Sequence, residues 1–183
     1  AENVAIGYLA LTNNTTGTHN VAVGASDGSS GATLGTNSTG SQNTALGMQA
    51  LGSNTTADNN TGVGYQSLKA NTTGEYNTAV GVNTLDANTT GARNTGLGEF
   101  ALSANTTASF NTGVGSSSLG LNTTGASNTA VGHNSLQRNT TAANNTAVGK
   151  DAGSAITTGA NNTLIGGLAG DSLTTGSNNI MIG

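Results

Sequence analysis

Large hydrophobic residues recur at two fixed positions of a 17-residue unit that fills the whole chain. One position is the Val, Ile or Leu of the motif Asn-x-x-[Val/Ile/Leu]-Gly, and the other is a Leu five residues later. The clearest unit runs from Asn77 to Arg93. The motif begins at Asn3, Asn20, Asn43, Asn60, Asn77, Asn94, Asn111, Asn128, Asn145, Asn162 and Asn179. Every interval is 17 residues except the second, which is 23 and indicates an insertion loop at about 26–31.

This pattern predicts strands and turns. A 17-residue unit is too short for a helical hairpin of about 34 residues, and Gly, Asn and Thr form helices poorly. Asn-Thr-Ala-Val-Gly is typical of a short strand that ends at a Gly with positive φ. We therefore expect an all-β fold, a parallel β-solenoid (β-roll) in which each unit forms one coil. Residues 1–183 should form a single solenoid domain, a rod roughly 50 Å long at about 4.8 Å per coil.

Two columns, each one position of the unit followed through all copies, change together near the C-terminus. The Leu column becomes Gly153 and Gly170 in the last two units, and the Asn column three residues later, here called the turn-Asn column, becomes Ile156 and Leu173. A large apolar group is lost at one column and gained at the other, which predicts that both columns fill one interior. The predicted core members are Leu68, Leu85, Leu102, Asn71, Asn88, Ile156 and Leu173. We expect the amides of the turn-Asn column to form a buried ladder between coils.

The Val column, which holds the Val, Ile or Leu of the motif, is also predicted to point inward, with Val63, Val80 and Val114 as core residues. Strand alternation places the motif's second residue, mostly Thr, on the same face. The Ala/Gly column between them, with Leu164 and Met181 as exceptions, is then expected to face the opposite way.

Charge and composition narrow the classes of function. The chain has 29 Gly, no Pro or Cys, 7% charged residues and a net charge of −4. The few bases form no basic stripe for nucleic acid and no polybasic membrane patch, and no apolar run is long enough to span a bilayer. Charged and aromatic residues occupy the variable pairs of the unit, apart from the insertion and Glu2 near the start, so these pairs are predicted to be solvent-facing corners.

No constellation of residues points to catalysis, a metal or a cofactor. His19 and His133 lie in different columns, several coils apart, without a carboxylate partner at fixed spacing. Residues 24–28 match Gly-x-Ser-x-Gly by letter, but no helix or nearby His follows. Asp27 in the insertion is an alternative cation ligand. We expect a protein that is not an enzyme.

One corner column carries Tyr76, Arg93 and Phe110 in successive coils. This order predicts a guanidinium stacked between two rings. The alternative is a ligand-contact platform for a cell-surface glycan.

Several Asn residues fit the N-glycosylation pattern. Those of the turn-Asn column would be blocked by burial, whereas Asn59, Asn144 and Asn161 lie at predicted corners.

Two large apolar side chains per coil offset little of the conformational entropy lost when the coil becomes ordered. A core shared between chains would bury more apolar surface and stabilise the fold. We therefore expect self-association, as a homotrimer or as a head-to-tail filament. Filament growth would use the two ends, which carry the same strand motif at Asn3 to Gly7 and Asn179 to Gly183.

The repeated Asn-Thr-Ala-Val-Gly with Ala-Leu and Asn-Thr-Thr-Gly resembles the repeat region of phage tail fibres and related bacterial surface proteins. Asn3 to Gly7 also resembles the head repeat of trimeric autotransporter adhesins, a β-roll of shorter period. Both resemblances imply an elongated structural fibre that is extracellular, on a cell surface or on a virion, with adhesion through exposed corners. The alternative function is an ice-binding solenoid that uses Thr columns. Against it, we expect the first Thr after each turn Asn to point outward and the second inward.

Overall fold

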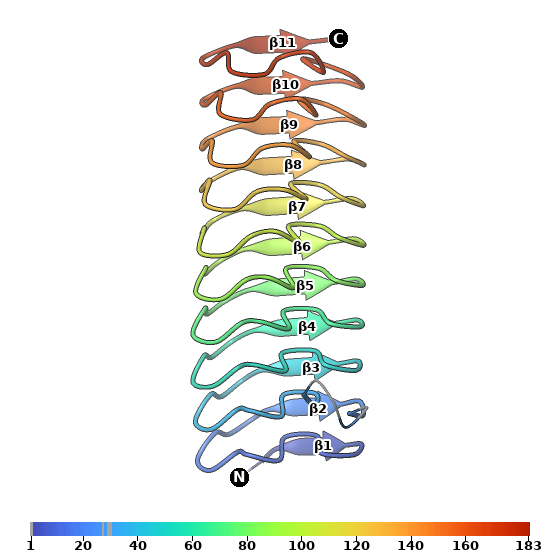
Figure 1. The fold of residues 1–183 in the computed structure, drawn as a ribbon, viewed down its shortest axis with the longest axis vertical. Helices are drawn as coiled ribbons and strands as arrows, with labels where there is room; N and C mark the ends of the chain where they lie inside the picture. Colours follow the sequence, from blue (N-terminus) through green and yellow to red (C-terminus); the bar gives the residue numbers. More distant parts are fainter. Residues whose placement is uncertain (1, 27, 29–30) are drawn as a thin grey trace.

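The computed structural model describes residues 2–26, 28 and 31–183, and within them the chain is an all-β solenoid (Figure 1). Eleven short parallel strands form one sheet in chain order, one strand for each coil. The strands are β1 (Val4–Ile6), β2 (Val21–Val23), β3 (Thr44–Leu46), β4 (Thr61–Val63), β5 (Thr78–Val80), β6 (Thr95–Leu97), β7 (Thr112–Val114), β8 (Thr129–Val131), β9 (Thr146–Val148), β10 (Thr163–Ile165) and β11 (Ile180–Ile182). The described residues contain no helix. The predicted fold class is confirmed.

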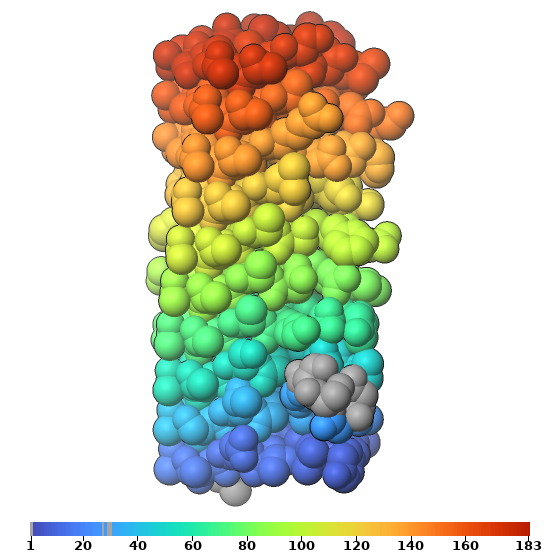
Figure 2. All heavy atoms as spheres, viewed as in Figure 1, coloured from blue at the N-terminus to red at the C-terminus, as the bar shows by residue number. Residues whose placement is uncertain are grey.

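Register is constant along the rod. Thr78 lies opposite Thr95 and Val80 opposite Leu97, and the same pairing continues through the other strands. The insertion leaves it intact, because Val21 of β2 still pairs with Thr44 of β3. Residues 27, 29 and 30 of the insertion lie outside the described part. In space-filling view the molecule is a straight column of nearly constant width (Figure 2).

Backbone hydrogen bonds also link successive coils outside the strands. The Leu51 amide donates to the Ser67 carbonyl at 3.0 Å, and the Thr89 amide donates to the Thr106 carbonyl at 2.8 Å. These bonds repeat along the stack, so the corners are tied to their neighbours as the strands are. Such continuous pairing satisfies backbone groups that a narrow coil could not satisfy alone. The result is a rod whose stiffness comes from main-chain ladders on several faces.

The Leu column fills the interior. Leu68, Leu85 and Leu102 are fully buried, as predicted. Each Leu adopts a left-handed backbone conformation, with φ of 53° at Leu85. This conformation is uncommon for a residue with a large side chain. This residue lies in a tight turn, which directs the Leu side chain into the interior of the coil behind the sheet.

Two Asn ladders run through the interior. In the predicted turn-Asn column, the Asn88 amide donates to Asn71 Oδ1 and to the Gly91 carbonyl, each at 2.9 Å. A second ladder, which the sequence analysis missed, is formed by the Asn that opens each motif. Its Oδ1 accepts the backbone N–H of the equivalent Asn in the next coil, as between Asn77 and Asn94 at 3.0 Å. Both columns are fully buried in the central coils.

The C-terminal exchange of large groups is also confirmed. Gly153 replaces Leu with a φ of 59°, and the space beside it is filled by Ile156 and Leu164, both fully buried. A Cβ at Gly153 would lie 2.6 Å from Leu164 Cδ1 and 3.3 Å from Ile156 Cδ1. Leu173 and Met181 are partly buried against the same core. Leu164 shows that the Ala/Gly column also points inward.

The predicted orientation of the strands was therefore wrong. Val80 is exposed, and Val63 and Val114 are only half-buried, whereas Ala79 between the two outward positions of β5 is fully buried. The physical reason is space. The gap behind the sheet is so narrow that a Cβ at Gly96 would lie 2.6 Å from Thr84 Cγ2. Only Ala or Gly fits there in most coils, so the branched side chains face away from the interior.

Candidate functional site

The outer face of the sheet is the most extensive candidate site. We call it the strand face, formed by the two outward side chains of each strand. Its Val column comprises Ile6, Val23, Leu46, Val63, Val80, Leu97, Val114, Val131, Val148, Ile165 and Ile182. Exposed fractions are 46% at Leu46 inside the stack and reach 76% at Ile182 in the last strand. No charged residue lies in either column of this face.

The other column of the strand face is mostly Thr. Eight strands, β3 to β10, begin with a half-buried Thr. None of the hydrogen bonds found in the described residues involves these eight hydroxyls. By contrast, the Thr55 hydroxyl near a corner donates to the Thr72 carbonyl at 3.1 Å. The strand face therefore combines an apolar column with a row of hydroxyls that can bond to water or to a partner.

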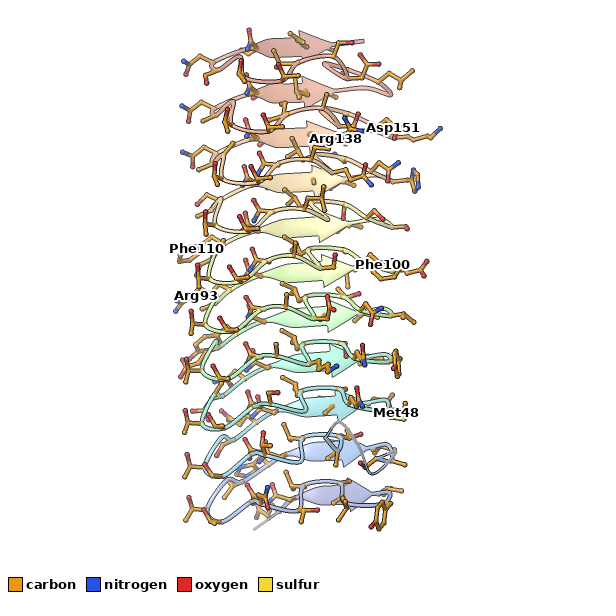
Figure 3. All side chains as sticks on the ribbon, in the orientation of Figure 1. Met48, Arg93, Phe100, Phe110, Arg138 and Asp151 are labelled. Carbon is orange, nitrogen blue, oxygen red and sulfur yellow. The ribbon has the colours of Figure 1, made fainter. Side chains whose placement is uncertain are left out.

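Corner residues border the strand face on both sides. The leading corner, just before each motif Asn, carries Tyr76, Arg93 and Phe110. The trailing corner, just after each motif Gly, carries Tyr65, Val82 and Glu99. Figure 3 shows Arg93 and Phe110 at one side of the rod, and Met48, Phe100 and Asp151 at the opposite side.

The stacked corner has the predicted geometry. Arg93 Cζ lies 5.1 Å from the centroid of the Tyr76 ring and 5.7 Å from that of Phe110. Both rings are about half exposed. Within the described chain the guanidinium has no carboxylate within ion-pair distance. The two rings hold its orientation while its N–H groups stay accessible.

Ion pairs are few. In the described residues they are His19 with Glu2 at 2.5 Å and Lys150 with Asp151 at 3.5 Å, both at the surface. The hydrogen bond from the Asn134 amide lowers the pKa of the Asp151 carboxyl, with a smaller contribution from Lys150. Exposed pairs of this kind contribute little to stability.

Partial burial raises the pKa of the Asp86 carboxyl, and a backbone hydrogen bond at Asp86 and the charge of Lys69 only partly oppose this effect. Asp86 Oδ1 and Asn83 Oδ1 are buried and have no hydrogen-bond partner among the described residues. No group of three or more His, Asp or Glu side chains converges anywhere in the described part of the chain. Asp27, the cation ligand weighed from the sequence, lies outside the described residues. The other candidates, His19 and His133, are both exposed.

The Asn-Thr-Thr corners differ from the prediction. The first Thr is half-buried and its hydroxyl is used between coils, as Thr89 donates to the Thr106 carbonyl at 3.0 Å. The second Thr, for example Thr90, is exposed rather than inward. These residues form a bend, so strand alternation does not apply to them.

Burial separates the glycosylation patterns as expected except at Asn59, which is half-buried rather than exposed. The turn-Asn column is buried in the central coils, whereas Asn144 and Asn161 are exposed at the leading corner.

Comparison with known proteins matched no family model, no curated protein and no solved structure. Within the described residues, no helix has the length and apolar character needed to cross a membrane.

Proposed function

We propose that this chain is a structural shaft segment of an extracellular, cell-surface or phage-type fibre, and that three parallel copies associate through their strand faces. The shape supports this, since main-chain ladders run from β1 to β11 without a break in register. A shaft needs stiffness and length rather than a reaction centre. We take the number of copies, three, from the fibre proteins that the repeat resembles.

The observation that carries the proposal is the outward-facing Val column, whose members are exposed or half-buried. Eleven Val, Ile or Leu side chains stand in one straight line on the strand face, a stripe roughly 50 Å long at the usual strand spacing. A continuous apolar surface of this extent on a protein marks an interaction site. Three such faces around a common axis would bury the stripe of every copy. The surface that sequence analysis assigned to the interior of one coil becomes the interior of the assembly.

Three lysines on the strand face should dissociate the assembly. In the variant Val80→Lys, Leu97→Lys, Val114→Lys, we expect the molar mass by light scattering to fall from three chains to one, because adjacent ammonium groups would be buried together. The far-ultraviolet circular dichroism spectrum should stay unchanged, since these side chains lie outside the coil.

The matched control is Thr73→Lys, Thr90→Lys, Thr107→Lys, which places three lysines on the Asn-Thr-Thr corners, outside the strand face. These threonines are exposed and, like the three strand-face positions, follow one another in successive coils. The control should keep the mass of three chains. A strand-face variant that also keeps three chains would contradict the proposal.

Ice binding is the second candidate. It is supported by the eight strand threonines and by the exposed second Thr of each corner, which present hydroxyls at a regular coil spacing. Thermal hysteresis of the purified chain tests it directly. Absence of hysteresis at high concentration would remove this candidate without affecting the fibre proposal.

A further inference from the structure

Packing of strand faces alone leaves the register between chains almost undefined. The Val and Thr columns repeat with every coil, so a slip by one coil, about 4.8 Å, exchanges equivalent side chains and loses contacts only at the ends. A slip that is the same at every interface gives a staggered helical arrangement, while zero slip closes a ring of three. A closed trimer therefore needs a feature that breaks the repeat.

In a parallel trimer with strand faces inward, the leading corner of one copy meets the trailing corner of the next. This follows from the geometry, because the two corners border the strand face on opposite sides (Figure 3). With zero slip, corners of the same coil meet. Each coil thus contributes one leading and one trailing residue to every interface.

One coil carries opposite charges at these two positions. Arg93 is the leading residue just before β6, and Glu99 is the trailing residue just after it. No other described coil has an acid at one corner and a Lys or Arg at the other. In the preceding coil the pair is Tyr76 and Val82, so an aromatic ring meets an apolar side chain.

Both charged groups are accessible to a partner. Glu99 is exposed, and neither it nor Arg93 has an ion-pair partner within the described chain. Tyr76 and Phe110 fix the guanidinium of Arg93 at 5.1 and 5.7 Å, which lowers the entropy that it loses on pairing. A slip of one coil would place Arg93 beside Val82 or Ser116 and leave Glu99 beside a ring.

We propose that Arg93 of one copy pairs with Glu99 of the next copy and so sets zero slip in the trimer. This inference rests on the proposed function. The partner is a second copy of this chain, and the contact is repeated at each of the interfaces. Charge complementarity of this kind selects register more than it adds affinity. In the trimer this corner contacts the neighbouring copy rather than a glycan.

Cysteine cross-linking tests the pairing, since the chain has no Cys of its own. The double variant Arg93→Cys, Glu99→Cys should form disulfides between copies, and the species on a denaturing gel should shift from one chain to three upon mild oxidation. Within one chain the two positions lie on either side of β6, too far apart for a disulfide. Reduction should return the single-chain band.

The matched control is Arg93→Cys, His133→Cys. His133 is an exposed trailing residue two coils further on, about 10 Å away along the rod. It should stay a single chain on the gel. If the unmodified chain is a trimer but 93 and 99 do not cross-link, or 93 and 133 do, the register inference is overturned and the fibre proposal stands. If the unmodified chain is a monomer, both fail.

Discussion

Leu136→Gly is expected to lower the free energy of unfolding by about 3 to 5 kcal/mol, the range for deleting a large buried side chain that leaves a cavity. Leu136 is fully buried in the interior of the solenoid. Its left-handed φ of 50° suits Gly, so the loss reports packing rather than backbone strain. Urea unfolding followed by circular dichroism measures it. Leu121 is exposed, so Leu121→Gly is the matched control and should lower the free energy of unfolding far less.

The protein itself contains the compensation for this change. Beside Gly153, the side chains of Ile156 and Leu164 occupy the space of the missing Leu. The equivalent positions one coil earlier are Asn139 and Ala147. The triple variant Leu136→Gly, Asn139→Ile, Ala147→Leu moves the boundary between the two core packings by one coil. It should regain at least half of the lost stability. A triple variant no more stable than the single would show that the exchange is not one packing unit.

Gly81→Ala is expected to lower the unfolding free energy by about 3 kcal/mol or more, because strain and overpacking act together. Gly81 has a φ of 136°, where residues with a Cβ are strained. An added Cβ would lie 2.7 Å from the carbonyl carbon of Gly98 in the next coil. The position of the added Cβ is fixed by the backbone and the carbonyl carbon of Gly98 belongs to it. The clash could therefore be relieved only by displacing a whole coil.

Gly167→Ala is the control for this prediction. A Cβ at Gly167 would meet nothing closer than the Lys150 carbonyl at 4.0 Å, and its φ is outside the left-handed region. Its thermal midpoint should stay close to that of the unmodified chain. Equal midpoints for the two alanine variants would mean that coils are not packed as closely at the motif Gly as described.

The sequence was sufficient to predict the architecture. A strict period, with Leu85 and Asn88 in columns that change together near the C-terminus, specified a solenoid coil and two of its interior columns. The insertion could be assigned to a corner for the same reason, since register resumes at Thr44. These inferences needed only that an interior of constant volume stay filled.

The strand orientation could not be read from hydrophobicity. Val80 has the same apolar character whether it packs inside its own coil or against a second copy. The informative signal was the smallness of Ala79 and its equivalents, together with Leu164 and Met181. Both exceptions directly follow the units in which Leu becomes Gly, which is what an inward column would show. The motif Asn was missed as a ladder because a polar residue at a strand start is equally typical of an exposed turn.

Packing of the strand face against other copies of the chain determines the mass of the particle in solution. The molar mass of the unmodified protein in solution, by light scattering behind a sizing column, tests it most directly. We expect a single species of three chains, each of 17.7 kDa, at all concentrations above the dissociation range. A stable monomer at high concentration would contradict it, because the exposed Val column would then face water. A molar mass that rises far above three chains with increasing concentration would contradict the closed trimer and indicate a filament instead.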